Sequence, residues 1–253
     1  MSDNNLDYIR KIKSAINFFT DIIFPIECLG CGKEGKWICE RCASAIPINR
    51  NSYCLGCKTK TDFGEFCDQC ESQYNLSGVF IASDYDNELI EKTIKALKYR
   101  FVYGISRELS RLLILFMDRQ RAKIKGNESL PRVITGFSNA VAMPVPLHKK
   151  RQKWRGFNQA EKLAAEFAKH FRLELNTEDL RRVVSTKSQA KLSEAERKKN
   201  LIDSLAWRGA GLAGRNIIIV DDVTTTGSTL EECAKVLKRA GAGEVWGLVV
   251  AKG

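Results

Sequence analysis

Two groups of residues in this chain have types and spacings that could do chemistry, and the first lies near its C-terminal end. Asp221 and Asp222 follow the apolar run Ile217–Val220. Carboxylates accept hydrogen bonds from vicinal hydroxyls, while hydroxyls and backbone amides at the start of a helix can hold a phosphate. The pattern predicts a site for a 5-phosphorylated ribose. The residues expected around its phosphate are Thr224, Thr225, Thr226, Gly227, Ser228 and Thr229.

This run has two other interpretations. Four apolar residues followed by two acids also occur in the metal-binding strand of P-loop ATPases, but the chain contains no GxxxxGK[ST] motif, which argues against an ATPase. The second interpretation is purely structural, with Asp221 and Asp222 only capping the turn that follows them.

The second group is a set of cysteines. Eight of the nine cysteines form four CxxC pairs. Two such pairs complete a tetrahedral S4 site suited to zinc, and a site with four thiolates leaves no position for water, so we expect two structural zinc ions. Neighbouring pairs are expected to share a metal, although an interleaved pairing stays open. The predicted ligands are Cys28, Cys31, Cys39 and Cys42 at one site, and Cys54, Cys57, Cys67 and Cys70 at the other.

Disulfides are the alternative use of these cysteines. The first residues, MSDNNLDYIR, lack the basic and apolar regions of a signal peptide, and no apolar run is long enough to span a membrane. We therefore expect a soluble, cytoplasmic protein, in which disulfides are disfavoured.

The elements that position the acid pair belong to an alternating pattern that begins at residue 76. Strands alternating with helices indicate an α/β domain with a parallel sheet covered on both faces, which binds its ligand at the carboxyl ends of the strands. Lone Cys233 lies on an apolar helix face and is expected in the core, whereas His170 is expected on a helix surface. Strands are predicted at 79–82, 141–145 and 217–220, and helices at 87–99, 104–117, 158–170 and 230–239.

We divide the chain into three parts. Residues 1–24 have apolar side chains at helical spacing before Pro25, which predicts an amphipathic helix that packs on the zinc module or, less favoured, contacts a membrane surface. Residues 25–75 form the zinc module, and residues 76–253 form the α/β domain.

Charge is distributed unevenly. The chain has a net charge of +11, but residues 1–75 are close to neutral, so the zinc module is expected to serve docking or structure rather than to bind DNA. Its aromatic residues are expected to pack rather than to stack on bases. Residues 141–200 carry about 8 excess positive charges, which would attract phosphate, pyrophosphate or nucleic acid, unless they form only a solvated surface.

Several motifs in order carry a resemblance to a known family. The run Ile217–Thr229 resembles the signature of type I phosphoribosyltransferases, and the wider chain resembles the ComF/GntX family. The one departure is Ser138-Asn139-Ala140, where relatives usually carry an acid before PVPL. The motifs are the four CxxC pairs, Tyr85 with Leu89, Ile90, Lys95, Lys98 and Tyr99, the segment Pro144–His148, the segment Arg155–Ala160, and Glu196, Arg197 and Asn200.

This resemblance implies a type I phosphoribosyltransferase domain behind a double zinc ribbon, and binding of phosphoribosyl pyrophosphate (PRPP) with Mg²⁺. It implies that Asp221 and Asp222 hold the ribose hydroxyls, that Thr224–Thr229 bind the 5′-phosphate, and that His148 and Lys149 meet the pyrophosphate. Arg155 is a further pyrophosphate candidate because its RGFNQ segment is expected to open a helix, whose N-terminus favours anions. A hood over the site would contain Thr186, Gln189, Arg197 and Asn200.

The family also implies a role in natural transformation, in which a cytoplasmic factor for DNA uptake handles imported single-stranded DNA with a helicase-like competence partner. One alternative is an active phosphoribosyltransferase, similar to amidophosphoribosyltransferases, acting on an unknown acceptor. Another is a zinc-ribbon adaptor with a degenerate transferase domain.

Overall fold

The computed structural model describes residues 26–99, 103–123, 139–184 and 204–253. The chain divides into two compact units, one extending to Ala45 and one from Ile46 to Gly253. The division falls between the two groups of cysteines, so the second group belongs to the same unit as the sheet. The helix expected at residues 1–24 lies outside the described residues, and the three-part division made from the sequence stays a prediction.

The first unit contains the first two CxxC pairs. Isolated pairing between Glu27 and Glu34 closes one turn, and the helix α2 (Glu40–Ala45) carries the last cysteine of the group. None of the residues of α2 is buried. With so little apolar burial, metal binding must supply much of the folding free energy of this segment.

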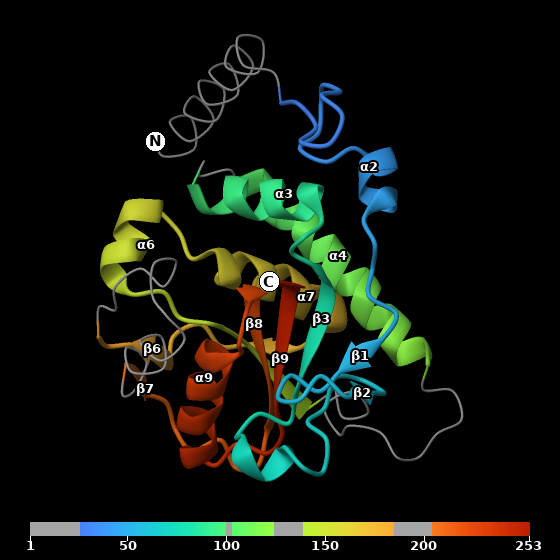
Figure 1. Ribbon diagram of the computed structural model, residues 1–253. Helices are drawn as coiled ribbons and strands as arrows, with labels where there is room; N and C mark the ends of the chain where they lie inside the picture. The colour runs from blue at the N-terminus through green and yellow to red at the C-terminus, as the bar shows by residue number, and fades with distance from the viewer. Residues whose placement is uncertain (1–25, 100–102, 124–138, 185–203) are drawn as a thin grey trace, which may run out of the picture. The chain divides into compact units, whose positions relative to one another are not determined.

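A five-stranded parallel sheet forms the centre of the second unit (Figure 1), which confirms the predicted α/β class. The central strand is buried on both faces, because Ile217–Val220 are fully inaccessible to solvent. This burial explains its unbroken run of β-branched residues. In spatial order the strands are β3 (Gly78–Asp84), β9 (Val245–Lys252), β8 (Asn216–Thr224), β4 (Ala140–Pro144) and β5 (Glu174–Leu175).

Helices cover the two faces of this sheet (Figure 1). On one face, α7 packs against β4 and β8, and α4 packs against β3 and β9. On the other face, Ile217 and Ile219 share a cluster with Leu230 and Leu237 of α9. The bounds of the helices are α3 (Glu88–Tyr99), α4 (Tyr103–Ala122), α6 (Lys149–Arg155), α7 (Gln159–Phe171) and α9 (Ser228–Arg239). The antiparallel pair β6 (Leu180–Arg182) and β7 (Leu205–Trp207) lies beside α9.

The second zinc-ribbon segment, which is the part of residues 25–75 that follows Ala45, belongs to the core of this unit. It contains the antiparallel strands β1 (Ser52–Tyr53) and β2 (Lys60–Thr61) and the short helix η1 (Glu71–Gln73). Phe66 stacks on Tyr74 with ring centroids 4.0 Å apart, and both belong to the apolar cluster that includes α9. The segment therefore packs on the same face of the sheet as α9. Phe63 and Phe66 are buried, as expected of the aromatic residues of the module, but Tyr53 is 50% exposed and departs from that expectation.

Several expected bounds were wrong, and the helix predicted at 104–117, for example, continues to Ala122. The strand predicted to end at Val220 continues to Thr224, because its pairing with β9 extends to Lys252. No helix was predicted at Lys149–Arg155, but this basic segment is the helix α6. The side chain of His148 accepts a hydrogen bond from Lys150 N and caps this helix at its start, and Gly156 ends it with a left-handed conformation.

Two single residues lie where the sequence predicted them. Cys233 is fully buried with Leu230 and Leu237, and His170 is exposed in the last turn of α7. Across the described residues, none of the helices combines the length and apolarity that crossing a bilayer requires.

Candidate functional site

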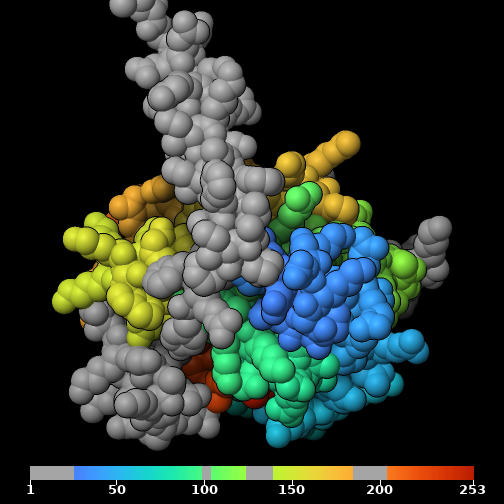
Figure 2. All heavy atoms as spheres, turned by 90° about the horizontal axis from the view of Figure 1, so that it is seen from above, coloured from blue at the N-terminus to red at the C-terminus, as the bar shows by residue number. Residues whose placement is uncertain are grey.

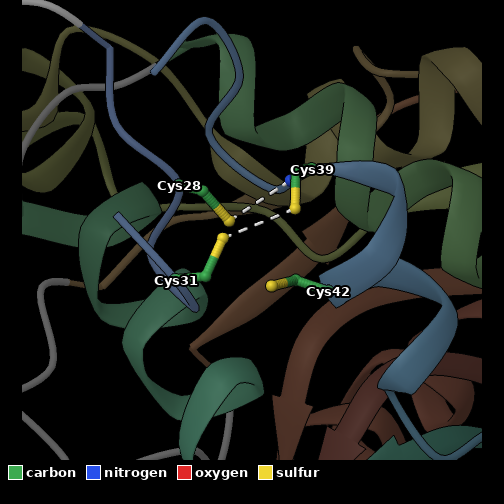
Figure 3. Close-up of side chains that lie close together, drawn as sticks. All are labelled: Cys28, Cys31, Cys39 and Cys42. Atoms are coloured by element: carbon green, nitrogen blue, oxygen red, sulfur yellow. Dashed lines mark hydrogen bonds between the residues drawn. The ribbon is translucent and has the colours of Figure 1, made fainter. Parts of the chain in front are cut away.

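The first four cysteines converge on one point (Figure 3). Their sulfur atoms all lie within 4.8 Å of one another, and Cys31 Sγ and Cys39 Sγ are 3.6 Å apart. Tetrahedral zinc with four thiolates places sulfur atoms about 3.8 Å apart, since Zn–S bonds are about 2.3 Å long. Cys28 Sγ also accepts a hydrogen bond from the backbone N–H of Cys39. The cluster fits a structural zinc ion.

The second four cysteines form an equivalent cluster. Their sulfur atoms lie within the same 4.8 Å limit, and Cys57 Sγ is 3.5 Å from Cys67 Sγ. Hydrogen bonding with Thr59 lowers the pKa of Cys57 to about 6, which favours the thiolate that a metal needs. Neighbouring CxxC pairs therefore share each cluster, and the interleaved arrangement is excluded. This cluster fits a second structural zinc ion.

The acid pair lies near the carboxyl end of β8. Since successive strand residues point to opposite faces, Asp222 shares the face of Ile218 and Val220, and Asp221 shares the face of Ile217 and Ile219. The Asp222 side chain is only 4% exposed, and its Oδ1 is 3.0 Å from the ammonium of Lys98. Its buried Oδ2 accepts no hydrogen bond from the described residues.

Lys98 is the counter-ion of this pair, and the sequence assigned it no role. Burial alone would lower the pKa of Lys98, but Asp222 and Asp221 outweigh burial and raise it. The ammonium is therefore charged at neutral pH, on α3, whose buried face includes Ile94 and Leu97. The signal in the sequence was a lysine directly after these apolar residues, but only the fold shows which acid it meets.

Asp221 has a different environment. Burial and the neighbouring charge of Asp222 raise the pKa of Asp221 to about 7, although Lys98 acts in the opposite direction. The backbone N–H of Asp222 donates to Asp221 Oδ1 over 2.8 Å. Arg182 of β6 also lies close enough to lower this pKa, and the sequence had not suggested this residue. The acid pair therefore keeps one carboxyl group that titrates near neutrality.

The loop after β8 leads directly into α9. Gly227 precedes the helix with φ of 77°, a left-handed conformation that favours glycine. The hydroxyls of Thr226 and Ser228 are 2.7 Å apart, and Thr225 is exposed. Hydroxyls and the unpaired amides of a helix start are donors suited to a phosphate.

The second zinc-ribbon segment contacts both this loop and the first turn of α9. A Cβ on Gly227 would overlap the side chain of Leu55, which lies inside the Cys54–Cys57 turn. Glu231, in the first turn of α9, accepts hydrogen bonds from Asn75 N at 2.9 Å, from Asn75 Nδ2 at 2.7 Å and from Leu76 N at 3.1 Å. These bonds tie the segment after the last zinc turn to the start of α9, and they give the Glu231 carboxylate three donors.

The segment after β4 supplies the remaining candidates. His148 is half-buried at the start of α6 and Lys149 is exposed. The RGFNQ segment opens a helix as expected, since Asn158 caps α7, but Arg155 itself ends α6 and does not lie at a helix N-terminus. Its charge nevertheless acts on Lys98, the counter-ion of Asp222, because it opposes the rise in the pKa of Lys98. The predicted hood residues Thr186, Gln189, Arg197 and Asn200 lie outside the described residues.

The elements that carry these groups meet at the carboxyl end of the sheet (Figure 1). Figure 2 views the molecule from this end, where α3 and α6 lie at the surface. Carboxylates at Asp221 and Asp222, donors from Thr225 to Ser228, and cations at Lys98 and Arg155 offer partners for a ligand with vicinal hydroxyls and several phosphates.

Comparison with known protein families gives two matches. Residues 19–71 match the double zinc ribbon domain, and residues 155–252 match the phosphoribosyl transferase domain.

Full-length relatives are also similar to this chain. Competence protein F of Haemophilus influenzae is 32% identical over 229 residues, covering 83% of this chain and 95% of that protein. DNA utilization protein YhgH of Escherichia coli is 31% identical, covering 84% and 90%. Competence protein ComFC of Bacillus subtilis is 28% identical, covering 74% and 78%. With its two domain families and the match along nearly the whole of competence protein F, the chain belongs to the ComF family, together with ComFC and YhgH.

Proposed function

We propose that this chain binds PRPP with Mg²⁺ at the carboxyl end of β8 and serves natural transformation by handling imported single-stranded DNA. One observation supports the choice of ligand. The acid pair, in which Lys98 lies 3.0 Å from Asp222 and neutralises its charge, is followed directly by a hydroxyl-rich loop at the start of a helix. In this proposal Asp221 and Asp222 accept from the ribose hydroxyls, and the loop from Thr224 to Thr229 holds the 5′-phosphate.

The pyrophosphate end of the ligand meets cations. Lys98 contacts Asp222, and Arg155 lies close enough to Lys98 to act on its pKa. His148 and Lys149 begin the neighbouring helix α6. The oxygen atoms of Asp221 and Asp222 are hard donors of the kind that Mg²⁺ accepts, so these residues fit a magnesium ion carried by the ligand. When bound, the ion offsets negative charge on the pyrophosphate.

The cellular role rests on the relatives. Their names describe competence and DNA utilization, which supports a ComF-type role in transformation for this chain. A place on the cytoplasmic side of the membrane, a helicase-like competence partner and a peripheral membrane contact belong to this proposal.

The decisive experiment is calorimetric titration of the zinc-loaded protein with PRPP and Mg²⁺, with and without a single-stranded oligonucleotide. Asp222→Asn should weaken PRPP binding by at least tenfold, because the amide offers a donor where the ribose needs an acceptor. Asp118→Asn, an exposed acid on α4, is the matched control and should bind as the wild type does. If Asp222→Asn bound PRPP as tightly as the wild type does, the proposed site would be wrong. If the wild type did not bind PRPP, the zinc-ribbon adaptor with a degenerate transferase domain would be favoured.

A second candidate is transfer of the phosphoribosyl group to an unknown acceptor. The observation that favours it is the carboxyl group of Asp221, whose pKa of about 7 suits proton transfer at neutral pH. Pyrophosphate release that depends on an added nucleobase or amine would establish transfer. PRPP binding without pyrophosphate release, across a broad panel of nucleobases and amines, would show that the protein binds PRPP but does not transfer the phosphoribosyl group.

A further inference from the structure

A cavity of about 490 Å³ lies between the second zinc-ribbon segment and the edge strand β3. Val79 and Ile81 of β3 line its apolar side, and Lys252 and Asp84 line it from the ends of β9 and β3. Its volume falls within the range of small-molecule sites. The remaining lining residues are Asn49, Arg50, Asn51, Ser52, Tyr53, Cys54, Leu55 and Lys58.

Positive charge is concentrated around this cavity. Arg50, Lys58 and Lys252 line it, against one acid, Asp84. At its margin the ammonium of Lys123 lies 3.3 Å from the carbonyl oxygen of Arg50. Burial lowers the pKa of Lys123, while nearby Asp62 opposes this shift and Lys60 adds to it. Arg50 and Lys58 come from the zinc module, and Lys252 of β9 and Lys123, which directly follows α4, add to their charge.

Tyr53 gives the cavity an exposed aromatic face. Its side chain is 50% exposed, whereas Phe63 and Phe66 of the same segment are almost fully buried. The side-chain amide of Asn49 is held near the cavity floor by Ile81 O and by Asp84 Oδ1. An exposed aromatic ring beside cations and amide groups is the combination that binds unpaired bases and their phosphates.

We propose that this cavity binds a nucleotide of single-stranded nucleic acid, with the base stacked on Tyr53 and flanking phosphates on Arg50 and Lys252. The inference rests on the proposed DNA-handling function and adds the surface that contacts the strand. Leu55 lines the cavity and also contacts Gly227, so the strand lies next to the phosphate loop without sharing its residues. Binding at the two sites is then coupled, and each ligand changes the affinity for the other by the same factor.

The test measures binding of a fluorescein-labelled oligothymidylate by anisotropy, over a series of salt concentrations, with PRPP affinity and zinc content measured on the same preparations. Tyr53→Ala should weaken oligonucleotide binding by about tenfold, in line with the loss of one stacked base, and Tyr53→Phe should retain it. Arg50→Gln with Lys252→Gln should reduce the slope of log affinity against log salt by about 1.4, for two lost phosphate contacts. Lys169→Gln, an exposed lysine at the end of α7, is the charge control and should leave the slope unchanged.

The outcomes separate this inference from the proposed function. If the wild type binds the oligonucleotide but Tyr53→Ala and the double variant bind equally well, only the cavity assignment is overturned. If the wild type does not bind it, the DNA-handling part of the proposed function is wrong as well. Displacement by double-stranded DNA as effectively as by the single strand would also count against stacking on Tyr53.

Discussion

At the scale of single residues, the ion pair between Lys98 and Asp222 decides the electrostatics of the candidate site. Lys98 is 22% exposed and Asp222 is 4% exposed, so neither charge is well solvated. Removing one partner from such a pair leaves an uncompensated charge, which costs far more than breaking a surface pair.

We predict that Lys98→Ala lowers the free energy of unfolding by about 3 kcal/mol and weakens PRPP binding, because Asp222 loses its counter-ion. The matched control is Lys95→Ala, three residues earlier on α3. The ammonium of Lys95 lies 2.7 Å from a carboxylate oxygen of Glu91 at the surface. That change should stay within about 0.5 kcal/mol. Urea unfolding of the two variants measures the difference, and equal effects would contradict the assigned role of Lys98.

The pKa of Asp221 predicts two pH effects of opposite sign. Its folded pKa of about 7 lies above the ordinary value of 3.8, so the folded state binds this proton more tightly than the unfolded chain does. The contribution of Asp221 to stability is therefore complete below about pH 4 and is lost as the pH rises through 7. Ligand binding needs the carboxylate, so PRPP affinity should instead rise over the upper part of that range.

Asp221→Asn tests both effects. The variant should gain stability relative to the wild type as the pH rises from 4 to 7, in unfolding experiments without ligand. It should also lose the pH dependence of PRPP binding near 7, as measured by calorimetry. A constant difference in stability across this range would show that Asp221 has an ordinary pKa in the folded protein.

At the scale of elements, the contact between the Cys54–Cys57 turn and the loop before α9 links the zinc ribbon to the phosphate loop. Gly227 holds a positive φ, and an added Cβ would overlap Leu55. The turn therefore fixes the position of the loop. Substitutions at Leu55 and at Gly227 should have non-additive effects, because the two residues are in contact.

We predict that Gly227→Ala lowers stability by about 1–3 kcal/mol and weakens PRPP binding, because of backbone strain and the overlap with Leu55. Leu55→Ala alone should weaken PRPP binding by a smaller factor, and the double variant should recover part of the loss of Gly227→Ala. Strict additivity in this double-mutant cycle would contradict the contact. Leu29→Ala, in the identical CLGC sequence of the first cluster, is the control and should leave PRPP binding unchanged.

At the scale of the whole molecule, the two zinc clusters belong to different units. Cys54 and Cys70 are buried in the same apolar cluster as Val79, Ile217 and Leu230, so the second cluster is part of the core beneath the sheet. The first cluster lies in the unit that ends at Ala45. The two metals should therefore have unequal effects on the α/β unit.

We predict that Cys57→Ser with Cys67→Ser reduces the zinc content from two ions to one, lowers the Tm of the main unfolding transition and weakens PRPP binding. Cys31→Ser with Cys39→Ser should remove one zinc ion and leave that transition in place. Native mass spectrometry gives the metal content, and calorimetry gives the transition. Equal losses of Tm from the two pairs of substitutions would be inconsistent with the division of the chain into these units.

Much of this architecture follows from local patterns. The alternating strands and helices predicted the parallel sheet, the four CxxC pairs predicted the two cysteine clusters, and the apolar run before Asp221 predicted a buried central strand. The helix α6 was missed because its sequence, KKRQKWR, lacks an apolar face, and its start and end depend on His148 and Gly156.

The sequence by itself determined which chemical groups this protein has, because CxxC spacing and an acid pair before a hydroxyl-rich loop are local features that need few distant partners. Only the tertiary structure decided which distant residues meet them. Lys98 reaches Asp222 from α3, and Leu55 supports Gly227 from the zinc ribbon. Lys123 and Lys252 add positive charge beside Arg50. Each of these contacts joins positions remote along the chain, and packing around one sheet, rather than periodicity, brings them together.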